Sequence, residues 1–181
     1  MNVDLSMCTT AEVVILLAPE LHEIVQIISV AARKHNPEKT GGWFAFWHTD
    51  PNGVVALPVI GIPGGLVSPD RFLLFNHFAN EKAVRLAGRP HDISSWQSRD
   101  ESDPDQMKHR YGGAIRCSRN SGMQPIFSFS GFSEDEDEAV CAILAMRCQM
   151  MTDEYLLRII EASGNSLLAE YRSSRDTKHP W

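Results

Sequence analysis

The alternation of apolar and polar residues along the chain predicts helices separated by pairs of short strands. Apolar residues at helical spacing over 21–32 indicate a helix that begins at Pro19 and stops before Asn36-Pro37. Thr9 and Glu12 have the spacing of a capping box, but Pro19 interrupts a helix that starts there. The first long helix is therefore expected to start at Pro19.

Two short apolar runs follow, at 43–48 and 54–60, and a Pro-Asn-Gly turn joins them. This pattern predicts a β-hairpin, and Pro58 places its second strand at an edge or a bulge. Ser68-Pro69-Asp70 then opens a helix that runs to about Ala87, where Gly88-Arg89-Pro90 ends it. The core-facing residues expected on this helix are Phe72, Phe75, Phe78 or Ala79, and Leu86.

The second half of the chain predicts a loop, a second pair of strands and two further helices. Residues 91–108 are polar and predict a surface loop, and strands are expected at 113–118 and 124–130. A capping box formed by Ser133 and Glu136 opens a helix over 133–151, whose apolar residues are spread widely enough to pack on more than one side. A further helix over 153–162 is expected to end at Gly164.

Hairpins separated by helices indicate an α+β domain with an antiparallel sheet of about five strands, rather than a doubly wound parallel sheet. A length of 181 residues suits a single domain over 1–181. Its core is expected at about 19–151, and 152–181 is expected to form a helical extension with a polar tail.

The composition of the chain limits the kinds of partner and the location that we expect for it. A net charge of −6 argues against nucleic acid, whose phosphates need a basic surface. No run approaches the 18 or so apolar residues of a membrane span, and the first residues lack the basic start of a secretory signal. The four cysteines show no CxxC spacing, so free thiols and a cytoplasmic location are expected.

Four short motifs, in this order, resemble the GlcG/HbpS-type domain of heme-binding and "heme-degrading domain" proteins. They are Asn80-Glu81-Lys82-Ala83 with Gly88-Arg89-Pro90, the strand that begins Tyr111-Gly112-Gly113, Phe129-Ser130-Gly131, and the acidic helix start at 134–138. The resemblance covers about 21–151. It implies a profilin-like fold, a non-enzymatic small-molecule-binding function with heme or a related planar tetrapyrrole as ligand, and a homo-oligomer.

Two segments depart from the family pattern. The strand Ile126-Phe127-Ser128-Phe129 is bulkier and more aromatic than the family's, and 107–111 replaces a proline-rich approach to the glycine pair. Both lie close to where the family's pocket is expected. Heme binding therefore has to be tested on this chain's own residues.

The candidate binding residues are His77, Lys82, His109, Gly112, Gly113 and Ser130. The glycine pair allows close approach of a ligand, or else serves a strand bulge. The Ser130-Gly131 exit could hold an anion on free amides, but the acids that follow would repel an anion, and a helix cap explains them fully. Lys82 offers a cation for a propionate, or pairs locally with an acid.

His77 and His109 are candidate axial ligands for iron, and the alternative is that both face solvent. Cys141 and Cys148 lie two helical turns apart, which suits a soft-metal site or, more simply, packing. Trp43 and Trp47 share one strand face and stack on a ligand or pack in the core. No residue pattern has zinc-site spacing or the arrangement of a nucleophile and base, so neither a metal site nor an enzyme is expected. The competing hypothesis is a cytosolic homo-oligomeric scaffold without cofactor.

Overall fold

The computed structural model of the chain describes residues 9–49, 55–100, 102, 111–117 and 124–176. The predicted Pro-Asn-Gly turn, the connection between the strands predicted at 113–118 and 124–130, and His109 lie outside these residues. In chain order the elements are α1 (Thr10–Ala32), β1 (Gly41–Thr49), β2 (Val55–Gly65), α2 (Pro69–Ala87), the short 3-10 helix η2 (Ser95–Ser98), β3 (Ala114–Arg116), β4 (Gln124–Ser130), α3 (Glu134–Arg147), α4 (Asp153–Ser163) and α5 (Ser166–Asp176).

The four described strands form one antiparallel sheet with the order β2-β1-β4-β3. The two predicted strand pairs meet at its centre, where β1 pairs with β4 from Trp43↔Ser130 to Thr49↔Gln124. The α+β class and the antiparallel pairing are confirmed, with four strands in the described part of the chain where about five were expected. β2 is an edge strand whose pairing shifts register opposite β1 between Phe46 and His48, which confirms the placement of Pro58.

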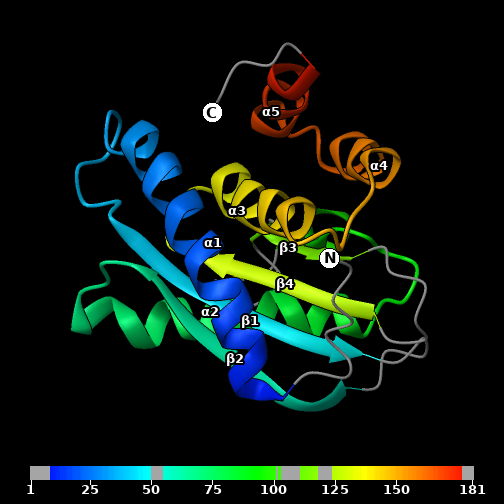
Figure 1. Ribbon diagram of the computed structural model, residues 1–181, viewed down its shortest axis with the longest axis horizontal. Helices are drawn as coiled ribbons and strands as arrows, with labels where there is room; N and C mark the ends of the chain where they lie inside the picture. The colour runs from blue at the N-terminus through cyan, green and yellow to red at the C-terminus, as the bar shows by residue number, and fades with distance from the viewer. Residues whose placement is uncertain (1–8, 50–54, 101, 103–110, 118–123, 177–181) are drawn as a thin grey trace.

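The sheet separates two layers of helices (Figure 1). Alternation along β1 sends Phe44 and Phe46 to the side of α1 and α3, where the rings of Phe44 and Phe127 meet edge to face at 5.2 Å. Trp43 and Trp47 face α2 on the other side. Trp43 packs against Phe72 with ring centroids 4.7 Å apart, and the Trp47 indole donates to Asn80 Oδ1 at 3.1 Å. Of the two alternatives for the tryptophans, these contacts agree with packing against the rest of the domain.

α1 begins nine residues earlier than expected. The Thr9 and Glu12 capping box is present, and the helix continues through Pro19. The missing amide of Pro19 lies on the solvent side, where water can satisfy the unpaired carbonyl, while Val13 and Leu17 before it are buried in the core. Over Ala11–Ala32 this helix is long and apolar enough to cross a membrane by length and composition, yet one side of it packs on the sheet.

The prediction of a surface loop at 91–108 is wrong for the first part of that segment. Residues 93–98 dock beside β3, where Ser94 forms an isolated bridge with Ile115 and the Arg116 amide donates to the Ile93 carbonyl at 2.9 Å. The three serines of this segment are buried, and burial is tolerated because their hydroxyls are bonded. Ser95 Oγ, for example, accepts the Ala114 amide at 3.0 Å.

α3 packs against the sheet, α1 and α5, which confirms the prediction that it is covered on more than one side. α4 ends at Gly164 in the left-handed conformation, as predicted, and α5 forms a separate helix beyond it. On α2, Ala79 and Leu86 are fully buried, whereas Phe72 lies at the margin of the interface. α2 covers its face of the sheet alone among the described helices (Figure 1).

Candidate functional site

The predicted site is centred on a buried ion pair between α2 and α3. Lys82 is 1% exposed, and its Nζ lies 2.8 Å from Asp137 Oδ2 and 2.8 Å from the Phe129 carbonyl at the end of β4. Asp137 Oδ1 also accepts the Phe132 amide at 2.9 Å. Burial raises the pKa of Asp137, while Lys82 and that amide oppose the shift. Lys82 is thus engaged by an acid of the same chain.

Gly113 makes room for this pair. A Cβ atom on Gly113 would lie 2.6 Å from the Asp137 Cβ and 2.9 Å from Lys82 Nζ, and the residue has φ +108°. Either feature alone excludes other side chains without rearrangement. Lys82 and Asp137 therefore occupy the space that the missing side chain of Gly113 leaves open.

Gly112 accommodates an indole. A Cβ on Gly112 would lie 2.5 Å from Trp96 Nε1, and the Gly112 amide donates to Glu134 Oε2 at 3.0 Å. The same carboxylate accepts Arg99 at 2.8 Å, and the Arg99 guanidinium lies 4.0 Å above the Trp96 ring. Both glycines thus fit against side chains of the protein itself.

The Ser130-Gly131 exit packs tightly on the start of β1. Ser130 is buried, and a Cβ on Gly131 would lie 2.4 Å from the Gly41 carbonyl. The amides at the start of α3 are occupied by its own acids, since Glu136 accepts from Ser133 and Asp137 from Phe132. The acidic run thus forms a helix cap, which was the alternative to an anion site at this position.

Glu138 is a buried acid that sequence reasoning missed. It is fully buried, it bonds the Ser94 hydroxyl, and its Oε2 accepts Asn165 Nδ2 at 2.9 Å. Asn165 in turn caps α5 by accepting the Leu167 and Leu168 amides. Burial raises the pKa of Glu138 to about 7, against the hydrogen bonds from Ser94, Ser163 and Asn165. The available signal was the helical spacing of Glu138 with Cys141 and Ala145, which are also buried.

Arg116 is a second buried charge that the sequence did not single out. Its guanidinium donates to the carbonyl of Leu86 in the last turn of α2 and to those of Arg89 and Asp92 just beyond the helix. Burial lowers the pKa of Arg116. The residue holds the C-terminal end of α2 on the sheet, because its guanidinium donates to three carbonyls there and a cation at that end complements the helix dipole.

The thiols of α3 are not exposed as a metal site. Cys141 is buried and lies 3.5 Å from the Gly113 carbonyl, and burial raises its pKa. Burial also raises the pKa of Cys148, to about 11. Among the described residues no group of three His, Cys, Asp or Glu side chains is arranged to hold a metal ion. Cys141 is buried and Cys148 is half-buried, which agrees with the simpler alternative of packing.

His77 lies apart from the buried residues. It is exposed on the outer face of α2, with its ring centroid 5.7 Å from that of Phe78, which meets Tyr111 edge to face at 5.1 Å. Of the predicted site residues, Lys82 and Gly113 lie close together in the fold. Gly112 precedes Gly113 in the chain, and Ser130 follows Phe129, whose carbonyl accepts a hydrogen bond from Lys82. Five residues advance an α-helix by about 500°, so the side chains of His77 and Lys82 point about 140° apart around α2.

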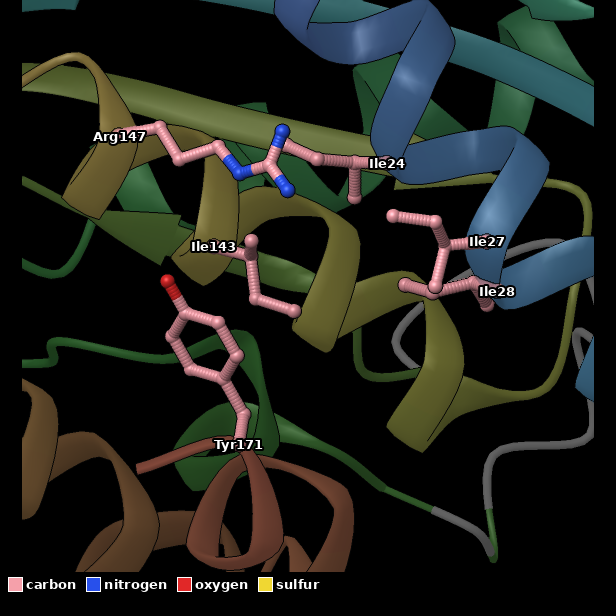
Figure 2. A pocket seen from close by; sticks show the side chains of 6 residues that line it. All are labelled: Ile24, Ile27, Ile28, Ile143, Arg147 and Tyr171. Atoms are coloured by element: carbon pink, nitrogen blue, oxygen red, sulfur yellow. The ribbon is translucent and has the colours of Figure 1, made fainter. Parts of the chain in front are cut away.

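Two pockets lie away from this site. One has a volume of about 250 Å³ and lies among the starts of β1 and α2 and the end of β2, lined by Glu38, Thr40, Gly41, Leu66, Val67, Ser68, Arg71 and Phe75. Figure 2 shows the other, of about 10 Å³, between α1, α3 and α5, where Arg147 and Tyr171 border isoleucine side chains. The second has room for about one water, and neither approaches the usual upper range of ligand cavities.

Comparison with known proteins gives matches among solved structures. No protein-family profile and no curated protein matches the chain. The chain is similar to the structure of the PduOC:heme complex, at 15% identity and a TM-score of 0.41 over 71% of this chain and 91% of that one. It is also similar to Klebsiella pneumoniae protein ORFY of the DUF336 family, at 12% identity and a TM-score of 0.45 over 80% and 92%. Both are proteins of the type that the sequence motifs resemble.

Proposed function

We propose that this chain is a non-enzymatic small-molecule-binding protein of the GlcG/HbpS type, with a profilin-like fold and with heme or a related planar, anionic tetrapyrrole as its ligand. The exposed surface around His77 carries the proposal. Leu73 and Leu74 precede the imidazole on the outer side of α2, and the Phe78–Tyr111 ring pair follows it. An imidazole with leucines before it and an aromatic pair after it suits an iron tetrapyrrole, which needs one axial ligand and a flat apolar contact.

The buried residues act in this proposal as the frame of the site. Lys82, Gly112, Gly113 and Ser130 fix α2, the start of β3 and the end of β4 against one another. Since Lys82 Nζ is already bonded to Asp137 and Phe129, the propionates would use a cation elsewhere on the surface or water. The non-enzymatic part of the proposal is supported by the internal bonding of Asp137 and Glu138, two acids whose environment would otherwise suit acid–base chemistry.

Hemin titration followed at the Soret band tests this function. Wild type is expected to shift the band, and His77→Ala to weaken binding by about tenfold or more, the equivalent of one lost ligand bond. His22→Ala is the matched control, because His22 is an exposed histidine on α1. His109→Ala tests the second predicted histidine. The proposal fails if wild type gives no shift, or if both His77→Ala and His109→Ala bind hemin as wild type does.

The second candidate is a cytosolic homo-oligomeric scaffold without cofactor. It is favoured by exposed apolar side chains on two helices, chiefly Ile15 and Leu16 on α1 and Leu73, Leu74 and Val84 on α2. The absence of any hemin-dependent absorbance change, together with a stable oligomer in light scattering, is the result that this candidate predicts. A monomer at micromolar concentration excludes it.

A further inference from the structure

The larger of the two pockets lies between two connections of the chain that hydrogen bonds hold together. One connection, 33–40, leads from α1 into β1, and the other, 66–68, leads from β2 into α2. The Thr40 hydroxyl donates to the Leu66 carbonyl at 3.0 Å, and the Leu66 amide donates to the Thr40 carbonyl at 3.3 Å. The first two turns of α2 complete the lining. The cavity is therefore built from segments that are joined to one another.

The lining of this pocket carries one acid and one base in direct contact. Arg71, in the first turn of α2, forms an ion pair with Glu38 from the connection between α1 and β1. Both side chains are exposed to solvent. An exposed pair contributes little to stability, so a ligand can replace each partner at small cost. The pocket thus offers a ligand two neighbouring charges of opposite sign.

An apolar surface lies beside this ion pair. Phe75 from α2 and Val67 from the second connection line the cavity and are half-buried, and Leu66 lines it and is largely exposed. Ligand sites in proteins combine such an apolar lining with a few polar groups that fix the orientation of the ligand. A ligand of this pocket can therefore place an apolar group on Phe75 and Val67 and its polar groups on the ion pair.

The volume of the cavity limits its ligand to a small molecule. About 250 Å³ lies just below the usual range of small-molecule sites, which begins at about 300 Å³. At ~30 Å³ for each water, this volume equals roughly eight waters, so a ligand of about nine non-hydrogen atoms fills it. A tetrapyrrole is several times larger. The pocket is therefore a different site from the surface around His77.

The balance of charge selects the chemical class of the ligand. An anion on Arg71 alone would lie beside the Glu38 carboxylate, and a cation on Glu38 alone would lie beside the Arg71 guanidinium, so each would be repelled by one neighbour. A zwitterion satisfies both, because its carboxylate pairs with the guanidinium and its ammonium group with the carboxylate. Since Glu38 and Arg71 are in contact, the two charges of the ligand must also be close together, as they are in an α-amino acid.

We propose that this pocket binds a free α-amino acid with an apolar side chain of the size of valine, leucine or methionine. The carboxylate of the ligand faces Arg71, its ammonium group faces Glu38, and its side chain lies on Phe75 and Val67. The proposal does not rest on a bound tetrapyrrole. Because both charges of the pocket are exposed, weak binding is expected, with dissociation constants of about 1 mM.

Titration of L-valine, L-leucine and L-methionine into the apo protein tests this proposal. Amide chemical shifts of the isotope-labelled chain follow the binding, and changes are expected at 38–41 and 66–75. Three analogues separate the contributions of the charges: isocaproate is leucine without the ammonium group, isoamylamine is leucine without the carboxylate, and ε-aminocaproate holds the two charges far apart. Each is expected to bind at least about tenfold more weakly than leucine.

Two variants test the assignment to this pocket. Arg71→Met and Glu38→Gln are each expected to weaken amino-acid binding by about tenfold or more, as loss of one ion pair to the ligand would do. Arg158→Met and Glu161→Gln make the same changes at exposed positions of α4, and they are expected to bind the amino acids as wild type does. Circular dichroism checks that every variant is folded.

Three outcomes overturn the proposal: no binding of any of the three amino acids at about 20 mM, an analogue that binds as tightly as leucine, or equal binding by the pocket variants and the α4 controls. Hemin titration of Arg71→Met is expected to match that of wild type. Amino-acid binding without hemin binding refutes the proposed function and leaves the pocket assignment standing, and hemin binding without amino-acid binding does the reverse.

Discussion

Lys82 and Asp137 join the two helical layers of the domain around the end of β4. Lys82 comes from α2 and Asp137 from α3, helices on opposite faces of the sheet, and their charged atoms lie 2.8 Å apart in the interior. Gly113 leaves the space through which they meet. The lysine-alanine pair, the glycine pair and the acidic helix start of the sequence thus belong to one structural unit.

Removal of the lysine alone is expected to be costly. Lys82→Met leaves the Asp137 carboxylate buried without its cation, and loss of one partner of a buried pair typically costs about 3–5 kcal/mol in the free energy of unfolding. Urea unfolding measures this cost. Lys39→Met, which removes a more exposed partner of Glu136 on the same helix, is the control and is expected to cost about 1 kcal/mol or less.

A double-mutant cycle tests whether the pair acts as a unit. Lys82→Met/Asp137→Asn keeps the shape of both side chains and an acceptor for Phe132, so it is expected to be more stable than the sum of the single changes by roughly 2 kcal/mol. Additive costs within error would show that the two residues contribute independently.

Gly113 is expected to tolerate alanine far worse than Gly164 does. Both have positive φ, but nothing lies within 4 Å of a Cβ on Gly164, whereas a Cβ on Gly113 would overlap Asp137 and Lys82. Gly164→Ala should therefore cost about 1 kcal/mol of unfolding free energy from backbone strain alone. Gly113→Ala should cost several times more, and equal costs would contradict the steric account.

Glu138 makes stability depend on pH in a defined window. Because burial raises its pKa to about 7, the folded chain holds a proton between about pH 4.5 and 7 that the unfolded chain releases. The contribution of Glu138 to stability is therefore full below that window, and it declines by up to about 3 kcal/mol as the pH rises through it.

Glu138→Gln should remove this decline, so that the variant gains stability relative to wild type as the pH rises from about 4.5 to about 7. Unfolding free energies at several pH values measure the difference, with Glu161→Gln, an exposed acid on α4, as control. A difference between wild type and Glu138→Gln that stays constant with pH would show that Glu138 does not titrate in this window.

The elements with strong periodicity and caps could be predicted from the sequence. The Ser68-Pro69-Asp70 start of α2, the Gly164 stop of α4 and the strand pairs all reflect local chemistry, and the structure has them in place. The start of α1 was predicted wrongly because of Pro19. Local helix propensity accounts for the hydrogen bond that proline cannot make, but not for the burial of the apolar residues before it, which stabilises the helix.

The contacts of the site could not be read from local patterns. Lys82 and Asp137 are 55 residues apart, and only the folded sheet brings them together. Residues 93–98 have the composition of a loop, yet four of them, Ile93, Ser94, Ser95 and Ser98, are buried. Ser94 and Ser95 bond Glu138 and Ala114 there. Short polar side chains signal a turn and a satisfied buried network equally well, so their role depends on distant partners.

The most direct test of the proposed function is the electron paramagnetic resonance spectrum of the hemin-loaded protein. If His77 ligates the iron, wild type and His22→Ala share the signal of nitrogen-ligated ferric heme, and His77→Ala loses it. A spectrum of wild type that matches free hemin, or one that His77→Ala leaves unchanged, would contradict the proposal that His77 on the outer face of α2 binds a tetrapyrrole.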